Sequence, residues 1–92
     1  MKTNIFEFDS ENKILPAVAW LPESEPIAVL QITHGMTEHI GRYEAFAEQL
    51  TASGIAVCGF DLRGHGKNGD DEEIASFGQG GWEFSLRDVR NF

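Results

Sequence analysis

The sequence predicts an α/β fold in which an antiparallel hairpin is followed by a strand–helix–strand unit and a further helix. Three observations support this prediction. Two short apolar segments near the start are separated by polar residues, two later apolar runs flank a helical pattern, and an amphipathic segment ends the chain. With 92 residues, 41% of them hydrophobic, and no internal repeat, the chain is assigned to a single domain over residues 1–92.

The first two strands are expected at residues 4–8 and 14–21, which are rich in β-branched and aromatic residues. Residues 9–13 between them are polar, which is typical of a hairpin connection. Pro16 has no backbone N–H to donate to a sheet. We therefore expect its strand to lie at a sheet edge or to begin after the proline.

The next two strands are expected at residues 27–32 and 55–60. Both are continuous apolar runs, which is typical of parallel strands covered on both faces. Between them lies an apolar stripe with helical spacing, made of Tyr43, Phe46, Ala47 and Leu50. Gly54 stands where a helix ends in the left-handed conformation. Together these segments form a βαβ unit.

The last segment predicts a helix with Trp82, Leu86 and Val89 on one face, which Phe92 continues. The sequence has no helix stop signal at this point. We therefore expect the domain to continue beyond the segments found here.

Charge and composition exclude several function classes. Fifteen acidic and seven basic residues give a net charge of −8, which repels nucleic acid and anionic lipid surfaces. The sequence has no apolar run near the length of a membrane span, and early charges argue against a signal peptide. We expect a cytoplasmic protein without an integral membrane segment. Its one cysteine, Cys58, lies in an apolar run and is expected to be a buried structural thiol.

Two polar clusters follow the two expected parallel strands, at residues 33–39 and 61–66. In open α/β sheets, ligands bind beyond the carboxyl ends of parallel strands. Because both clusters open onto the same rim of the sheet, we expect the functional site there.

Metal and nucleotide chemistry fit this rim poorly. His34, Glu38 and His39 do not have the spacing of a zinc motif on one helix face. The glycine-rich segments 64–66 and 78–81 match neither a dinucleotide fingerprint nor a phosphate loop. No metal and no cofactor are expected.

Acyl chemistry fits better, because several motifs occur in one order. They are His34-Gly35-Met36, Glu38-His39, Arg42-Tyr43 and Asp61-x-Arg63-Gly64-His65-Gly66. This order resembles the N-terminal part of α/β-hydrolases, most closely the lysophospholipase and monoacylglycerol lipase branch, also grouped as serine aminopeptidase-like hydrolases. The resemblance covers about residues 5 to 92 and implies an incomplete α/β-hydrolase fold.

The resemblance implies a role for each cluster. The backbone N–H of Met36 would contribute to an oxyanion hole, and His34, Gly35 and Thr37 would support that loop. His34 would thus be structural and not the catalytic base. A sharp turn that ties down neighbouring loops would be formed by Asp61, Arg63, Gly64, His65 and Gly66.

The chain contains no candidate nucleophile. A nucleophile elbow has the pattern G-x-S-x-G, and none of the five serines has it: Ser10, Ser24, Ser53, Ser76 and Ser85. In the family the whole triad comes after the last helix found here, so this chain alone is expected to be inactive.

Two functions remain open. In the first, the chain is the N-terminal portion of a serine hydrolase that cleaves small-molecule or lipid-like esters such as lysophospholipids or monoacylglycerols. In the second, it is a non-catalytic binding module or an inactive truncated product. In either case an unpaired strand, 28–32 or 57–60, would leave a sheet edge that can pair with another chain.

Overall fold

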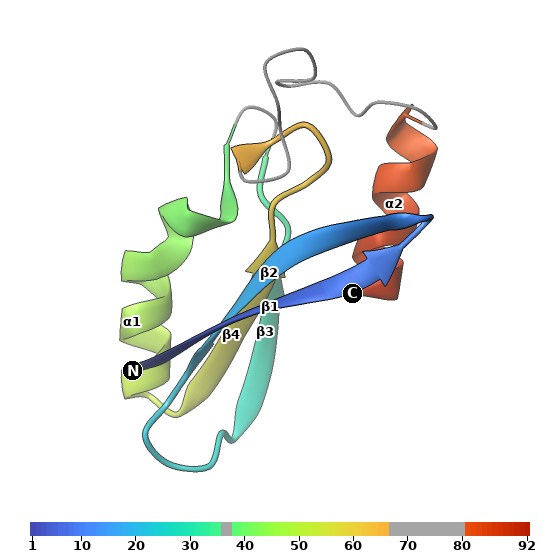
Figure 1. Cartoon of the computed structure of the whole chain (residues 1–92). Coiled ribbons are helices and arrows are strands. Elements are labelled where there is room, and N and C mark those ends of the chain that lie inside the picture. The colour runs from blue at the N-terminus through green and yellow to red at the C-terminus, as the bar shows by residue number, and fades with distance from the viewer. Residues whose placement is uncertain (36–37, 67–80) are drawn as a thin grey trace.

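A computed structural model describes residues 1–35, 38–66 and 81–92, with side chains from residue 83 onward in the last range. Along the chain the elements are β1 (Lys2–Ser10), β2 (Lys13–Leu21), β3 (Ala28–Ile32), the 3₁₀ turn η1 (Ile40–Tyr43), α1 (Glu44–Ala52), β4 (Ile55–Phe60) and α2 (Gly81–Asn91) (Figure 1). The strands form one mixed sheet in the order β1-β2-β4-β3. Strands β3 and β4 are parallel, and the other two pairs are antiparallel. The predicted α/β fold, a hairpin followed by a βαβ unit, is confirmed.

The hairpin is longer than its apolar residues suggested. Strands β1 and β2 pair from Lys2 opposite Leu21 to Ser10 opposite Lys13. The two residues between them, Glu11 and Asn12, have φ values of 47° and 63°. Two consecutive left-handed residues are the signature of a type I′ turn, whose twist matches that of the strands it joins.

The expectation for Pro16 is wrong. Strand β2 begins at Lys13 and lies between β1 and β4 rather than at an edge. However, β4 pairs only with the part of β2 from Ala17 to Trp20. Pro16, opposite Glu7 of β1, therefore lies just beyond that ladder, where β2 has a partner on one side only.

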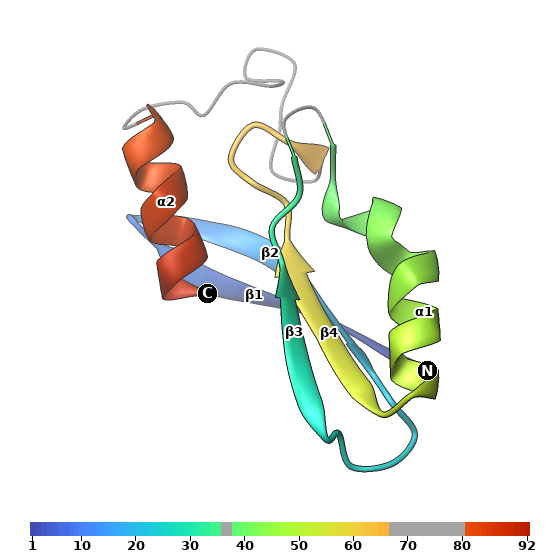
Figure 2. The same ribbon diagram turned by 180° about the vertical axis from the view of Figure 1, so that it is seen from behind.

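Apolar clusters lie on both faces of the sheet, and the helices flank it on opposite sides (Figures 1 and 2). The cluster beneath α1 and η1 contains Trp20, Ile40, Ala47 and Val57. The cluster beneath α2 contains Leu15, Ala17, Phe60 and Leu62. Strands β2 and β4 each contribute residues to both clusters, because successive side chains of a strand point to opposite faces.

The end of α2 is anchored by aromatic side chains. The ring of Phe92 lies 5.1 Å from those of Phe8 and Phe60, and Phe8 meets Phe60 edge-on at 4.9 Å. These centroid distances are in the range of favourable aromatic pairs. Phe92 thus joins the helix to the hairpin and to β4, as its predicted place on the buried face requires.

Most predicted helix positions are confirmed. Ala47 is buried, and Tyr43, Leu50 and Val89 pack against the apolar clusters of the sheet.

Two predicted helix positions are wrong. Phe46 and Leu86 were expected on buried faces, but 49% and 52% of their surfaces are exposed. Among the described side chains of α2, the buried ones are polar, Ser85 and Asp88. Hydrophobic periodicity cannot find such a face, because it counts a carboxylate as exposed. The Trp82 side chain lies outside the described residues.

The predicted stop of α1 is confirmed. Gly54 follows the helix with a φ of 87°, and its N–H donates to the Thr51 carbonyl.

The two parallel strands differ in how far they are covered. Strand β4 is central, whereas β3 is the edge strand and Val29 is 69% exposed. The expectation that both strands are covered on both faces is therefore wrong for β3.

Cys58 of β4 is half-buried and forms no disulfide. Burial raises the pKa of its thiol, which keeps it protonated and weakly nucleophilic at neutral pH.

In the described part of the chain, no helix combines the length and the apolar character that crossing a membrane requires.

Candidate functional site

The two polar clusters meet at one end of the sheet, where the parallel strands β3 and β4 end (Figure 1). One buried hydrogen bond joins them directly, and a second joins the 61–66 cluster to the residue that follows the 33–39 cluster. The backbone N–H of Leu62 donates to Nε2 of His34 at 2.9 Å, and the backbone N–H of Ile40 donates to Oδ1 of Asp61 at 2.7 Å. The predicted rim is thus built from both connections.

His34 is buried, with 3% of its surface exposed, and both of its ring nitrogens are used. Since Nε2 accepts from Leu62, the ring proton is assigned to Nδ1, which lies 2.8 Å from the Gly35 carbonyl oxygen and donates to it. A neutral ring with both nitrogens occupied has no free position for a proton. This arrangement lets His34 tie the end of β3 to the segment after β4, and it does not suit a general base.

The segment after β4 is a tight turn closed by its own backbone. The N–H of His65 donates to the Leu62 carbonyl at 2.9 Å, and Nδ1 of the buried His65 lies 2.8 Å from the Arg63 carbonyl oxygen. Gly64 and Gly66 have φ values of 72° and 49°, which favour glycine. At Gly66 a Cβ would also clash with the Asp61 carboxylate.

Arg63 is the buried centre of a polar network that sequence reasoning missed. Its Nε and Nη2 donate to the two carboxylate oxygens of Asp88 in α2, at 2.5 and 3.0 Å. Nη2 also donates to the Ser10 carbonyl at 2.8 Å, and the Ser10 hydroxyl donates to Asp88. The side-chain amide of Asn91 completes the network by donating to the Ser10 hydroxyl. The turn is thereby fixed to α2 and to the hairpin.

Glu38 is a second site residue that gained a role only from the structure. Its carboxylate accepts one hydrogen bond from the Gly35 N–H and one from the Tyr43 hydroxyl. The Tyr43 bond, followed by the nearby Arg42 charge and the Gly35 bond, lowers the pKa of Glu38 below its ordinary value. The sequence showed Glu38 only as part of a motif.

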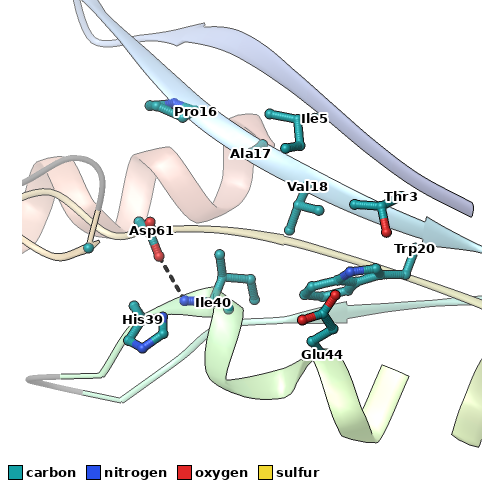
Figure 3. A pocket seen from close by; sticks show the side chains of 12 residues that line it. Thr3, Ile5, Pro16, Ala17, Val18, Trp20, His39, Ile40, Glu44 and Asp61 are labelled. Atoms are coloured by element: carbon teal, nitrogen blue, oxygen red, sulfur yellow. Dashed lines mark hydrogen bonds between the residues drawn. The ribbon is translucent and has the colours of Figure 1, made fainter. Parts of the chain in front are cut away.

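A hollow of about 250 Å³ adjoins the rim, between the hairpin and η1 (Figure 3). Apolar side chains dominate its wall, among them Ile5, Val18, Trp20 and Ile40. Asp61 and His39 supply polar groups where the hollow meets the rim. The hydrogen bond from the Ile40 N–H to Asp61 is drawn in the same view.

The remaining predicted residues are placed as follows. Met36 and Thr37 lie outside the described residues. His39 is exposed while His34 is buried, so the structure does not bring the two histidines into a shared coordination site. Over residues 1–35, 38–66 and 83–92 there is no group of three or more side chains that could hold a metal ion.

Comparison with known proteins gives a consistent result. The family model described as "Serine aminopeptidase, S33" matches residues 24–92. The monoglyceride lipase homolog of Monkeypox virus is 39% identical over 80 residues, which make up 86% of this chain and 29% of that protein. The monoacylglycerol lipase of Mycolicibacterium smegmatis is 42% identical over 50 residues, 54% of this chain and 18% of that protein.

A solved structure extends the match to nearly the whole chain. The thermostable carboxyl esterase from Bacillus coagulans superimposes with a TM-score of 0.82 and 27% identity, over 98% of this chain and 30% of the esterase. The chain thus spans less than a third of the length of each of these relatives. The mixed sheet, the rim motifs and these matches agree, and the chain belongs to the serine aminopeptidase (S33) family of α/β-hydrolases.

Proposed function

We propose that this chain provides the oxyanion-loop portion of a serine hydrolase that cleaves carboxylic esters such as monoacylglycerols or lysophospholipids. The observation that carries the proposal is the neutral, buried His34, which holds the Gly35 carbonyl at the end of β3 directly before Met36. The names of the relatives, which include a monoacylglycerol lipase and a carboxyl esterase, favour ester substrates.

In this proposal the backbone N–H of Met36 donates to the oxygen that becomes negative when an ester carbonyl is attacked. One such donor is worth about 10²- to 10³-fold in turnover. His34 and Gly35 position the strand end, and Thr37 continues the loop. The turn from Asp61 to Gly66 supports it from the β4 side through the Leu62 bond to His34.

Under this proposal the chain alone does not hydrolyse esters. None of its serines lies in a nucleophile elbow, so the nucleophile, its base and the acid would come from other residues. We further propose a cytoplasmic location and no nucleic-acid partner, in keeping with the net charge of −8.

A non-catalytic role is the second candidate, and the edge strand β3 favours it. Ile27 and Val29 are 80% and 69% exposed, and no strand of the described residues pairs with the outer side of β3. Such an edge can accept a strand from another chain. Under this alternative the chain would act by edge pairing without contributing to ester cleavage.

A chimera separates the two candidates. In it, the full 92-residue chain replaces the region of the B. coagulans carboxyl esterase that superimposes on 98% of this chain. Hydrolysis of a carboxylic ester and of a monoacylglycerol is measured beside the parent esterase and the chain alone. We expect the chimera to hydrolyse the ester and the chain alone to be no faster than buffer. A chimera whose circular dichroism matches the parent but which is inactive would contradict the proposed function and favour the non-catalytic role.

A further inference from the structure

We propose that Glu38 is the positioning residue of the oxyanion loop: its carboxylate joins Gly35 to Tyr43 and thereby fixes the backbone that leads into Met36. The inference rests on the function proposed above. Glu38 stands in one of the sequence motifs, but the motif alone assigned it no role in holding the loop.

Gly35 and Glu38 are joined by two reciprocal hydrogen bonds. The backbone N–H of Glu38 donates to the Gly35 carbonyl at 3.1 Å, and the backbone N–H of Gly35 donates to Oε2 of Glu38 at 3.1 Å. The Gly35 carbonyl also accepts from Nδ1 of His34. Both backbone polar groups of Gly35 are therefore bound, and Glu38 contacts each of them.

The other carboxylate oxygen reaches the start of the helical segment. Oε1 of Glu38 accepts from the Tyr43 hydroxyl at 2.9 Å, and Tyr43 packs against the apolar cluster beneath α1. Arg42 is 3.6 Å from the same oxygen, but its side chain is 68% exposed, so this ion pair contributes little. The loop is thus tied to the rigid core through Tyr43.

The geometry requires a carboxylate. Each oxygen of Glu38 receives a different donor, whereas a glutamine offers one oxygen and one NH₂ group, which cannot accept. A Cβ at Gly35 would clash with this carboxylate, so the glycine leaves the space that the contact needs.

The charge of Glu38 suits this role at neutral pH. Its pKa lies below the ordinary 4.5, first because Tyr43 donates to it. The same bond raises the pKa of Tyr43, which keeps the hydroxyl protonated as a donor. A lowered pKa in the folded state means that the contact is present above pH 4.5 and is lost as the pH falls through the lowered value.

Nuclear magnetic resonance of the ¹⁵N-labelled full chain tests the contact itself. We expect the Gly35 amide proton to shift with the ionisation of Glu38, and the substitution Glu38→Gln to abolish this titration. Tyr43→Phe should move its midpoint to higher pH. The matched control is Glu48→Gln, an exposed carboxylate of α1 that does not line the hollow. A Gly35 resonance that ignores Glu38→Gln, or responds equally to Glu48→Gln, would overturn the inference.

The chimera described above tests the consequence for turnover. Because misplacing a catalytic group by ~1 Å costs up to ~10²-fold, Glu38→Gln should lower kcat by about 10- to 100-fold. KM should stay within about twofold, since ground-state binding is unchanged. Glu48→Gln, which does not alter the hollow, should leave both constants unchanged.

The outcomes distinguish the two proposals. If the chimera with Glu38 intact is folded and inactive, the proposed function fails and this inference fails with it. If the chimera is active and Glu38→Gln leaves kcat unchanged, the inference alone is overturned.

Discussion

Asp88 is a carboxylate with none of its surface exposed, and its charge is balanced by Arg63. The guanidinium donates to both of its oxygens, and the Ser10 hydroxyl donates to it as well. A buried charge that loses its partner is strongly destabilising, because nothing replaces the lost solvation. This network is therefore the most sensitive polar contact among the described residues.

Replacing Arg63 by alanine should lower the free energy of unfolding by about 3–5 kcal/mol, because Asp88 would remain buried and unpaired. Arg87→Ala is the matched control, since the Arg87 side chain is 48% exposed and its ion pairs with Glu11 and Glu83 should be worth under ~1 kcal/mol. Urea unfolding followed by circular dichroism measures both. Equal losses for the two variants would show that the buried pair does not hold α2 in place.

The residue scale also shows which site features the sequence could predict. The rim residues His34 and Asp61 were predicted because polar residues after parallel strands meet at one end of a sheet. The pairing of Arg63 with Asp88 was not, because it joins residues 25 positions apart whose contact depends on where α2 packs. The role of Glu38 was missed for a related reason, because its contacts with Gly35 and Tyr43 depend on tertiary structure.

At the scale of elements, apolar patterns predicted the strands well and the helix faces in part. The run at 55–60 coincides with β4, whose side chains are buried on both faces. The first strand was predicted too short, because its polar ends are strand only through pairing with β2. On α2 the periodicity pointed correctly to Val89, which packs against the apolar cluster, and wrongly to the exposed Leu86. It could not point to Asp88, which is buried through a salt bridge.

The hairpin turn allows a direct test of backbone conformation. Asn12 has a φ of 63°, which asparagine and glycine tolerate and β-branched residues do not. Asn12→Val should therefore lower the stability of the chain by about 1–3 kcal/mol, while Asn12→Gly should change it by less than about 1 kcal/mol. Thermal unfolding of the two variants compares them. If both unfold at the wild-type temperature, the left-handed turn does not stabilise the hairpin.

At the scale of the whole molecule, two apolar clusters lie on the two faces of a four-stranded sheet, and no described strand pairs with the outer edge of β3. Exposed apolar side chains on an edge strand promote pairing between chains, and a lysine on the edge opposes it. We therefore expect the isolated chain to self-associate through β3.

Sedimentation velocity measures this association. Val29→Lys should shift the chain toward the monomer, because Val29 is 69% exposed on the edge strand. Phe46→Lys is the matched control, an exposed apolar residue on α1 away from the edge. Association that persists in Val29→Lys, or that Phe46→Lys removes equally, would argue against pairing through β3.

The central claim is that the backbone N–H of Met36 stabilises the developing oxyanion, and removing that N–H tests it most directly. In the chimera, Met36→Pro lacks the donor while Met36→Ala keeps it. We predict that kcat of the proline variant is about 10²- to 10³-fold below that of the alanine variant, with both proteins folded by circular dichroism. Equal kcat values for the two folded variants would contradict the assignment of the oxyanion donor to Met36.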